Sequence, residues 1–179
     1  MLASYNELCV LVEDGVITPV SFDDVNGTSI DVHLGHIVKR EKNLEHCINI
    51  VSLQEKQNIH WENVDITGSS YVLEPGEFIL AHTVEKFNLP SSVSAEFKLN
   101  SSGARIGLDN ALATWCDPGW NGSVLTLELR NNSRYHAIRL DHNCRIGQMI
   151  FHFSAPVPEK KSYAVRGRYN GDKVAQAVK

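Results

Sequence analysis

The sequence predicts a mainly β protein, a sandwich or barrel with one short helix at its N-terminus. Short runs rich in β-branched and aromatic residues recur after Pro19, and several of them alternate apolar with polar residues. Gly, Pro, Asn and Asp separate these runs, which is typical of sheets joined by tight turns. The chain has 179 residues, of which 42% are hydrophobic, so we expect one domain with its own core.

The N-terminal helix is predicted over residues 4–15. Ser4 can cap the first turn, Glu7 lies three residues later as in a capping box, and Gly15 is a stop signal. The predicted strands are Thr28–Leu34, Ile48–Leu53, Tyr71–Leu73, Phe78–Thr83, Val93–Leu99, Val124–Leu129, His136–Leu140 and Gln148–Phe153.

Composition and charge exclude several classes of protein. The net charge of −4 argues against a general nucleic-acid binder, and the longest apolar runs are too short to cross a membrane. The first residues lack the basic n-region of a signal peptide, so we expect a cytoplasmic protein. The cysteines form no C-x-x-C pair and are expected to be reduced, mostly buried thiols: Cys9, Cys47, Cys116 and Cys144.

Residues 159–179 differ in charge from the rest of the chain. They contain six basic and two acidic residues, a charge of +4, so the remaining residues must carry −8 to reach the total of −4. A solvated, frayed terminus is one explanation. The other is an arm that closes over an anionic ligand. The second explanation divides the chain into a β domain with its helix, residues 1–158, and a basic C-terminal arm, residues 159–179.

Local motifs give little support to zinc or nucleophilic catalysis. His60, Trp61 and Glu62 spell the H-x-E of the zinc nucleobase deaminases, but no C-x-x-C follows to supply two thiolate ligands. The sequence contains no G-x-S-x-G elbow and no P-loop. Cys116, beside Asp117, is better explained as a buried thiol than as a nucleophile.

The candidate site lies in the segment 96–129. Its first part carries the hydroxyls of Ser101 and Ser102, followed by Gly103 and Arg105. Hydroxyls and backbone N–H groups at the end of a strand suit phosphate oxygens, and a glycine allows close approach. An ordinary hydroxyl-containing turn has the same composition, so this motif alone is weak.

The second part of the segment combines a turn with a charged residue in a strand. Asp117–Trp120 reads D-P-G-W, in which Pro presets one turn angle and Gly accepts a positive φ. Glu128 interrupts an apolar strand and shares one face with Thr126. Its carboxylate either faces solvent or lies in a pocket with its pKa raised toward neutrality, where it could transfer protons.

Taken together, these motifs resemble the dCTP deaminase branch of the dUTPase-like superfamily over nearly the whole chain. The segments that carry the resemblance are Ser29–Gly35, Leu73–Glu77, Phe87–Pro90, Ser101–Leu108, Asp117–Trp120, Leu127–Leu129, Arg145–Phe151 and Arg168–Tyr169. Each motif alone is weak, whereas their order and spacing together are specific.

The resemblance implies a distorted β-barrel or jelly-roll of the dUTPase-like type. It implies a homotrimer with active sites at the subunit interfaces and no nucleic-acid or membrane partner. It also implies a hydrolase that converts dCTP and water to dUTP and ammonia, which supplies dUTP for thymidylate synthesis. No zinc is expected, and Mg²⁺ is expected on the nucleotide phosphates rather than on protein side chains.

The resemblance also assigns roles to residues. The catalytic residues are Glu128, as general base and then acid, Arg105, as electrostatic support, and Ser101, which positions the water. Asp117 takes the sugar hydroxyl, and the main chain around Ala113 reads the base. The substrate-binding residues implied in this way are Asn100, Ser101, Ser102, Arg105, Ala113, Asp117, Trp120, Thr126, Gln148, Tyr163, Arg168 and Lys173.

Several positions depart from the family pattern. Asn100 stands where the family has Arg, which removes a phosphate contact, and Asp172 stands where the arm has Gln. A carboxylate next to phosphate is unfavourable unless Mg²⁺ or Lys173 intervenes. The usual H-R-I before the turn is Thr114–Cys116, and the turn is displaced by one residue, although Arg105 and Glu128 keep the family separation.

Two alternatives to a dUTP-forming deaminase stay open. One is a nucleotide pyrophosphatase of the dUTPase type, or a bifunctional enzyme that forms dUMP, in which Asp117 activates water at the α-phosphate. The arm only faintly resembles the glycine-rich arm of dUTPases. The other is a non-catalytic nucleotide-binding homologue, which the residues Asn100 and Asp172 would fit.

Overall fold

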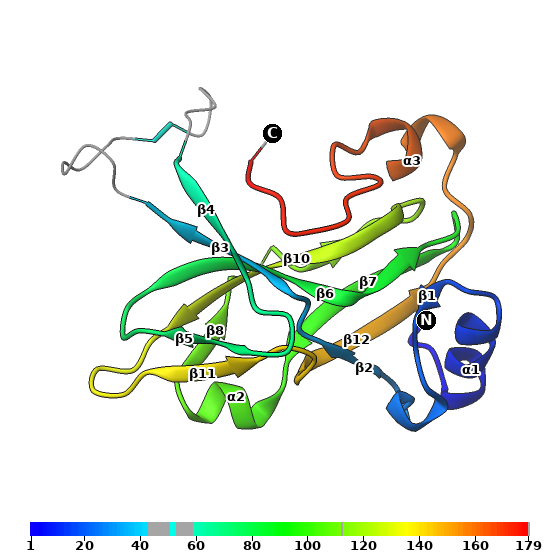
Figure 1. Cartoon of the computed structure of the whole chain (residues 1–179). Helices are drawn as coiled ribbons and strands as arrows, with labels where there is room; N and C mark the ends of the chain where they lie inside the picture. The colour runs from blue at the N-terminus through cyan, green and yellow to red at the C-terminus, as the bar shows by residue number, and fades with distance from the viewer. Residues whose placement is uncertain (43–50, 53–58, 112, 179) are drawn as a thin grey trace.

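The computed structural model describes residues 1–42, 51–52, 59–111 and 113–178 (Figure 1). In this part of the chain the helices are α1 (Tyr5–Glu13), α2 (Ser101–Arg105) and α3 (Tyr163–Arg166), with 3-10 turns η1 (Phe22–Asp24) and η2 (Glu159–Lys161). The strands are β1 (Ile17–Thr18), β2 (Ile30–His33), β3 (Ile37–Glu41), β4 (Trp61–Asp65), β5 (Ser70–Leu73), β6 (Phe78–Asn88), β7 (Val93–Leu99), β8 (Leu108–Asn110), β9 (Trp115–Cys116), β10 (Asn121–Asn131), β11 (Ile138–Asp141) and β12 (Arg145–Phe153). No helix among the described residues has the length and apolar composition of a membrane span.

These strands form three antiparallel sheets. The largest has the order β4-β3-β6-β10-β8, with β1 added beside β6; the second is β2-β12-β7-β9, and the third pairs β5 with β11. Register shifts distort the pairing of β10 with β6 between Asn121 and Ser123 and between Val124 and Thr126. The mainly β, dUTPase-like prediction is confirmed, and the described sheets are distorted rather than closed into a barrel.

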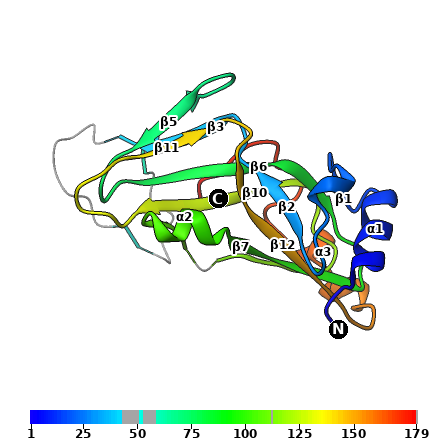
Figure 2. The same cartoon turned by 90° about the horizontal axis from the view of Figure 1, so that it is seen from below.

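Helix α1 forms where the sequence predicts it. The Ser4 backbone N–H donates to the Glu7 carboxylate at 2.8 Å and the Ser4 hydroxyl accepts the Glu7 backbone N–H, which makes a capping box; Ser4 Oγ also donates to the carboxylate at 2.6 Å. Gly15, with φ of 70°, follows the helix end. Leu8 and Leu11 are buried against the sheets. The two ribbon views place α1 at one end of the molecule and the β5–β11 sheet at the other (Figures 1 and 2).

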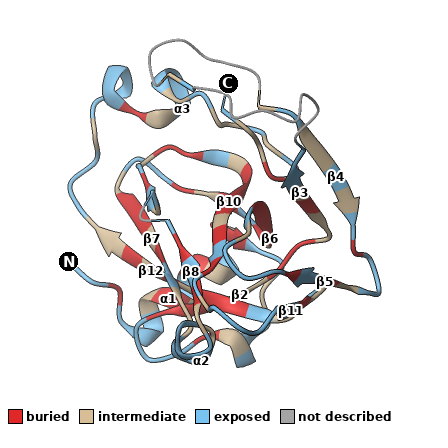
Figure 3. Ribbon diagram, turned by 90° about the vertical axis from the view of Figure 1, so that its left-hand side faces the viewer, coloured by how far each residue is buried: buried red, intermediate tan, exposed pale blue. Residues whose placement is uncertain are grey.

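The core follows the long central strands. Buried residues line β6, β7, β10 and β12, and exposed residues lie on the outer loops and turns (Figure 3). Alternation explains this pattern in β10, where Leu127 and Leu129 are fully buried while Thr126 and Glu128 point the other way. The core therefore fixes which face of β10 remains for a site.

Most predicted strands appear with altered ends. Strand β7 spans the predicted residues, whereas β6 and β10 are longer than predicted. The sequence missed β3 and β4, whose charged residues hide the alternation. The predicted strand Ile48–Leu53 lies outside the described residues except for 51–52. Ser101–Arg105 follow the end of β7, as expected, and form a short helix that Asn100 caps rather than the ordinary turn that was the alternative.

Candidate active site

A cavity of about 500 Å³ lies between β10, the turn after β9 and the C-terminal arm. Strands β4 and β6, which belong to the same sheet as β10, also contribute to its wall. The lining residues are Ile59, Trp61, Leu80, Ala113, Trp115, Cys116, Asp117, Trp120, Val124, Leu125, Thr126, Glu128, Tyr163, Tyr169, Asp172, Gln176, Ala177 and Val178. This size lies within the range of small-molecule sites.

Glu128 is the carboxyl group in this cavity whose setting is most perturbed. Burial raises the pKa of its carboxyl to about 7. Its Oε2 atom is buried and has no hydrogen-bond partner among the described residues. A buried oxygen of this kind costs free energy unless a ligand or water completes it. Glu128 therefore provides a carboxyl group that can gain and lose a proton near neutral pH.

Backbone contacts from the β8 side hold Glu128 in place. Its N–H donates to Asn110 Oδ1 at 3.0 Å, and its carbonyl accepts the N–H of Ala111 at 3.0 Å. Asn110 is 8% exposed, and its side-chain amide also donates to the Ala111 carbonyl at 3.0 Å. The sequence analysis missed Asn110, since nothing in the order of residues marks it as a neighbour of Glu128.

The D-P-G-W turn forms and brings Asp117 to the cavity. The Trp120 N–H donates to the Asp117 carbonyl at 3.2 Å, and Gly119 has φ of 87°. Trp115 Nε1 donates to Asp117 Oδ1 at 3.0 Å, which orients that carboxylate. Trp115 itself lines the cavity although it is 57% exposed. It replaces the usual residue of the family motif and was not among the predicted site residues.

The C-terminal arm follows β10 and covers the cavity from the same chain (Figure 1). Val124 N–H donates to the Asp172 carbonyl at 2.9 Å, and Gln176 N–H donates to Thr126 Oγ1 at 3.1 Å. Trp120 Nε1 donates to the Tyr169 carbonyl at 2.8 Å. Backbone hydrogen bonds thus hold the arm in place as one wall of the cavity.

The predicted phosphate-binding residues lie elsewhere. Ser101, Ser102 and Arg105 are exposed on α2 and do not line the cavity. Figure 1 places α2 below the strands and the C-terminal segment above β10. A single chain therefore does not bring these residues to Glu128.

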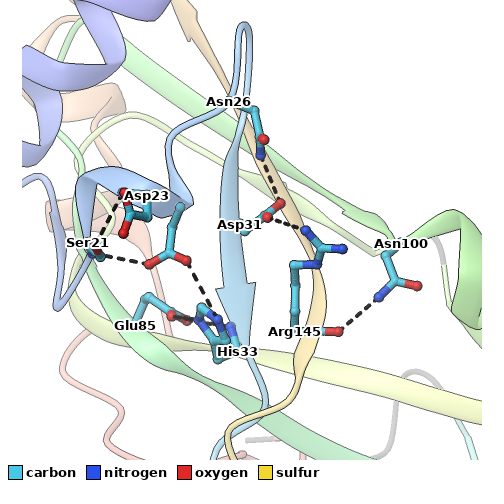
Figure 4. Close-up of polar contacts among 9 residues, drawn as sticks. Ser21, Asp23, Asn26, Asp31, His33, Glu85, Asn100 and Arg145 are labelled. Atoms are coloured by element: carbon cyan, nitrogen blue, oxygen red, sulfur yellow. Dashed lines mark hydrogen bonds and ion pairs between the residues drawn. The ribbon is translucent and has the colours of Figure 1, made fainter.

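Two further predicted binding residues have structural contacts outside the cavity. Asn100 Oδ1 accepts the Gly103 N–H at 2.6 Å as the N-cap of α2, and its amide donates to the Arg145 carbonyl at 2.9 Å (Figure 4). Gln148 Oε1 accepts the Ser29 hydroxyl at 3.0 Å. Asn100 thus supports α2 in a way that needs no charge.

The cavity is acidic. Asp117, Glu128 and Asp172 line it, and none of the described lining residues is Lys or Arg. Lys173 is exposed, and its ammonium group donates to the Gly122 carbonyl at 2.8 Å. Arg168 is also exposed and does not line the cavity. The predicted residues that do line it are Ala113, Asp117, Trp120, Thr126, Glu128 and Tyr163.

Cysteine and zinc chemistry receive no support from the neighbouring residues. Burial raises the pKa of Cys116 to about 12, so its thiol stays protonated at neutral pH. Glu62 pairs with Arg40 at 2.6 Å, which engages the acid of the H-x-E tripeptide. Within the described part of the chain, no group of three or more His, Cys, Asp or Glu residues could hold a metal ion.

The model of the family described as dCTP deaminase-like matches residues 3–154. The chain belongs to this family. A protein of Salinispora arenicola named "dCTP deaminase, dUMP-forming" is 34% identical over 97% of this chain and 91% of its own length. A protein of Corynebacterium diphtheriae with the same name is 30% identical over 97% of this chain and 94% of its own length. The recognition of the family and the prediction of an enzyme are confirmed.

A solved structure supports the fold. The crystal structure of 2′-deoxycytidine 5′-triphosphate deaminase from Agrobacterium tumefaciens matches with a TM-score of 0.67 and 19% identity. The match covers 86% of this chain and 49% of that chain. At 19% identity, this similarity shows that the two proteins share a fold.

Strands and loops distant in sequence supply the lining residues that the sequence analysis missed. Trp61 and Leu80 come from β4 and β6, Tyr169 and Gln176 from the arm, and Trp115 from β9. Tyr169 had a usable signal, since it lies within a motif that resembles the family, and Trp115 stands at a position where the chain departs from the family pattern. Trp61, Leu80 and Gln176 had none, because only the sheet order and the path of the arm bring them to Glu128.

Proposed function

We propose that this protein hydrolytically deaminates the cytosine of dCTP, with Glu128 as the group that transfers protons. The observation that supports this most strongly is the half-buried Glu128 carboxyl, whose pKa is raised to about 7 and whose buried Oε2 has no partner among the described residues. A carboxyl group that titrates near neutral pH can serve both as a base and as an acid.

The chemistry uses each form of Glu128 twice. The ionised carboxylate takes a proton from water, the hydroxide adds to C4 of the ring, and Glu128 delivers that proton to N3. Glu128 then takes the proton of the new C4 hydroxyl and passes it to the amino group, which leaves as ammonia while the C4 carbonyl forms, so dCTP and water become dUTP and ammonia. The apolar walls at Leu80 and Val124 keep bulk water away and strengthen the local electrostatics.

A second copy of the chain would complete the phosphate side of the site. The cavity supplies carboxylates, whereas Arg105 and the hydroxyls of Ser101 and Ser102 lie exposed on α2. A triphosphate needs cationic groups and donors. We propose that α2 of a neighbouring subunit meets the Glu128 cavity of the first subunit in a homotrimer, where Arg105 and Ser101 face the substrate and the attacking water.

Magnesium would accompany the phosphates. Mg²⁺ prefers oxygen ligands and is commonly held by substrate phosphates with one or two carboxylates. Asp117 and Asp172 at the cavity wall fit that chemistry as neighbours of a phosphate-bound ion. When bound, the ion would offset the repulsion between Asp172 and the phosphates, and the residues of this chain would still carry out the proton transfers.

The names of the relatives favour a second candidate, in which the product is dUMP. Several relatives are named "dCTP deaminase, dUMP-forming", including the two described above. Asp117 lines the same cavity as Glu128, held by Trp115 Nε1 at 3.0 Å, and could activate water at the α-phosphate. The two candidates share the deamination step and differ in whether the phosphate chain is cleaved.

Incubation with dCTP and Mg²⁺ tests the proposal, with ammonia, dUTP, dUMP and pyrophosphate measured in parallel. Ammonia with dUTP supports simple deamination, and ammonia with dUMP and pyrophosphate supports the bifunctional candidate. Glu128→Gln should lower ammonia release by about 10²- to 10⁴-fold, because Gln cannot transfer the proton. Nucleotide binding without any turnover by the parent protein would favour the non-catalytic homologue and reject both candidates.

A further inference from the structure

Asn110 is a buried polar residue whose contacts join the backbone of Glu128 to that of Ala111. It ends β8, where it lies opposite Leu129 in the pairing with β10. Its Oδ1 atom accepts the Glu128 N–H, and its amide donates to the Ala111 carbonyl, each at 3.0 Å. The oxygen and the amide nitrogen of the Asn110 side chain thus each form a hydrogen bond to the backbone just beyond the end of β8.

A third bond closes this arrangement. The Ala111 N–H donates to the Glu128 carbonyl at 3.0 Å, so both backbone groups of Glu128 on this edge are bound by Asn110 and Ala111. Ala111 lies two residues before Ala113, which lines the cavity. Movement of Ala111 would therefore move Glu128 as well.

We propose that Asn110 is a positioning residue of this site, which holds the backbones of Glu128 and Ala111 in one fixed arrangement. The inference rests on the proposed function, in which Glu128 transfers the protons. Fixing the backbone of the catalytic group to a buried amide keeps its position within the tolerance that proton transfer requires.

Asn110 also affects the proton affinity of Glu128. Burial raises the pKa of the Glu128 carboxyl, and a hydrogen bond from its own backbone N–H acts against this rise. Asn110 Oδ1 accepts that same N–H. Without this acceptor, the N–H would be free to donate more fully to the carboxylate, which stabilises the ionised form and lowers the pKa.

Other titratable groups surround Glu128, and the test must keep them constant. Cys116 on β9, Asp117 in the turn, Tyr163 on α3, and Tyr169 and Asp172 in the arm line the cavity. Asp109 on β8 and Arg130 on β10 lie opposite each other in the pairing beside Asn110 and Glu128. Strands β4 and β6 face the cavity with Trp61 and Leu80, which do not titrate. Asp109 already accepts the Asn110 N–H at 2.9 Å.

Two substitutions at Asn110 give opposite expectations. Asn110→Leu removes both hydrogen bonds, so kcat should fall roughly 10- to 100-fold while KM changes less. The acid limb of the pH profile of kcat should move to lower pH by roughly 0.5–1 unit.

Asn110→Asp keeps the acceptor for the Glu128 N–H and adds a negative charge, so the acid limb of the pH profile should move to higher pH. If Asn110→Leu does not fold, the direction of the Asn110→Asp shift still decides the matter.

Asn131 offers a matched control. It is fully buried on the same strand as Glu128, donates to the carbonyls of Leu73 and His136, and does not line the cavity. Asn131→Leu should lower the unfolding temperature and leave the pH profile of kcat unchanged. An Asn131→Leu profile that shifts as far as that of Asn110→Leu would reduce Asn110 to a general structural residue and overturn the proposal.

Direct titration of Glu128 separates this inference from the proposed function. The Glu128 carboxyl can be followed by NMR of carboxyl-labelled protein without any substrate, in the parent and both Asn110 variants. One informative result is a parent protein that fails to deaminate dCTP while the two Asn110 variants shift the pKa of Glu128 in opposite directions. That result would overturn the proposed function and leave the coupling of Asn110 to Glu128 intact. Equal titration curves in all three proteins, with unchanged kcat in the variants, would overturn the inference itself.

Discussion

The cavity face of β10 and the exposed helix α2 would divide the proposed chemistry between them. The β10 face presents Glu128 in a cavity of about 500 Å³ whose described lining contains three carboxylates and no Lys or Arg. Helix α2 presents Arg105 and two serine hydroxyls to the outside. The difference teaches that one chain builds the cavity around Glu128, while under the proposed function the phosphate-binding groups must come from a second surface.

The largest effect should come from separating these two halves. Arg105→Ala and Glu128→Gln should each lower deamination by at least about 10²-fold, since one removes electrostatic support and the other removes proton transfer. Trimers assembled from a mixture of the two variants should recover activity, because some sites then combine an intact α2 with an intact Glu128. Ammonia release before and after joint refolding measures the recovery.

A mixture of Arg105→Ala with Ser101→Ala is the matched control, because both substitutions lie on α2. No site in that mixture can collect an intact α2, so activity should stay low. Equal recovery in both mixtures, or none in either, would mean that Arg105 and Glu128 do not meet across a subunit interface.

The pH dependence should test the β10 half alone. Because burial raises the pKa of Glu128 to about 7, the ionised base is lost below that pH and kcat should fall about tenfold for each further unit. The stability effect has the opposite sign. Ionising this carboxyl inside the fold is unfavourable, so its destabilising contribution is absent below the ordinary pKa of 4.5 and grows as pH rises to about 7.

Thermal unfolding of Glu128→Gln against the parent checks that sign. The variant should be more stable than the parent at pH 8 and nearly equal to it at pH 4. A parent kcat that stays constant from pH 5 to pH 8 would show that Glu128 is not the group whose ionisation limits the reaction.

The sequence predicts the residues on the cavity face of β10 better than it predicts how that face lies relative to other strands and to helix α2. Alternation placed Thr126 and Glu128 on one face, and the turn chemistry of Asp117–Trp120 is set by Pro and Gly at fixed positions. Both are local rules. Asn110 and Leu80 reach Glu128 only because β8 and β6 pair with β10, and sheet order is not readable from local pattern. Asn100 was read as a lost phosphate contact, whereas its position before α2 makes it a helix cap.

The smallest effect should come from Trp115, which lies on β9, lines the Glu128 cavity and orients Asp117. Trp115→Phe keeps an aromatic wall and removes the indole N–H that donates to Asp117 Oδ1 at 3.0 Å. If Asp117 contacts the sugar, KM for dCTP should rise roughly 2- to 10-fold, the scale of one hydrogen bond, with kcat nearly unchanged. Trp61→Phe is the matched control, since Trp61 also lines the cavity and contacts Phe78 rather than an acid through its ring. A larger rise in KM for Trp61→Phe than for Trp115→Phe would place the sugar on the β4 side of the cavity and away from Asp117.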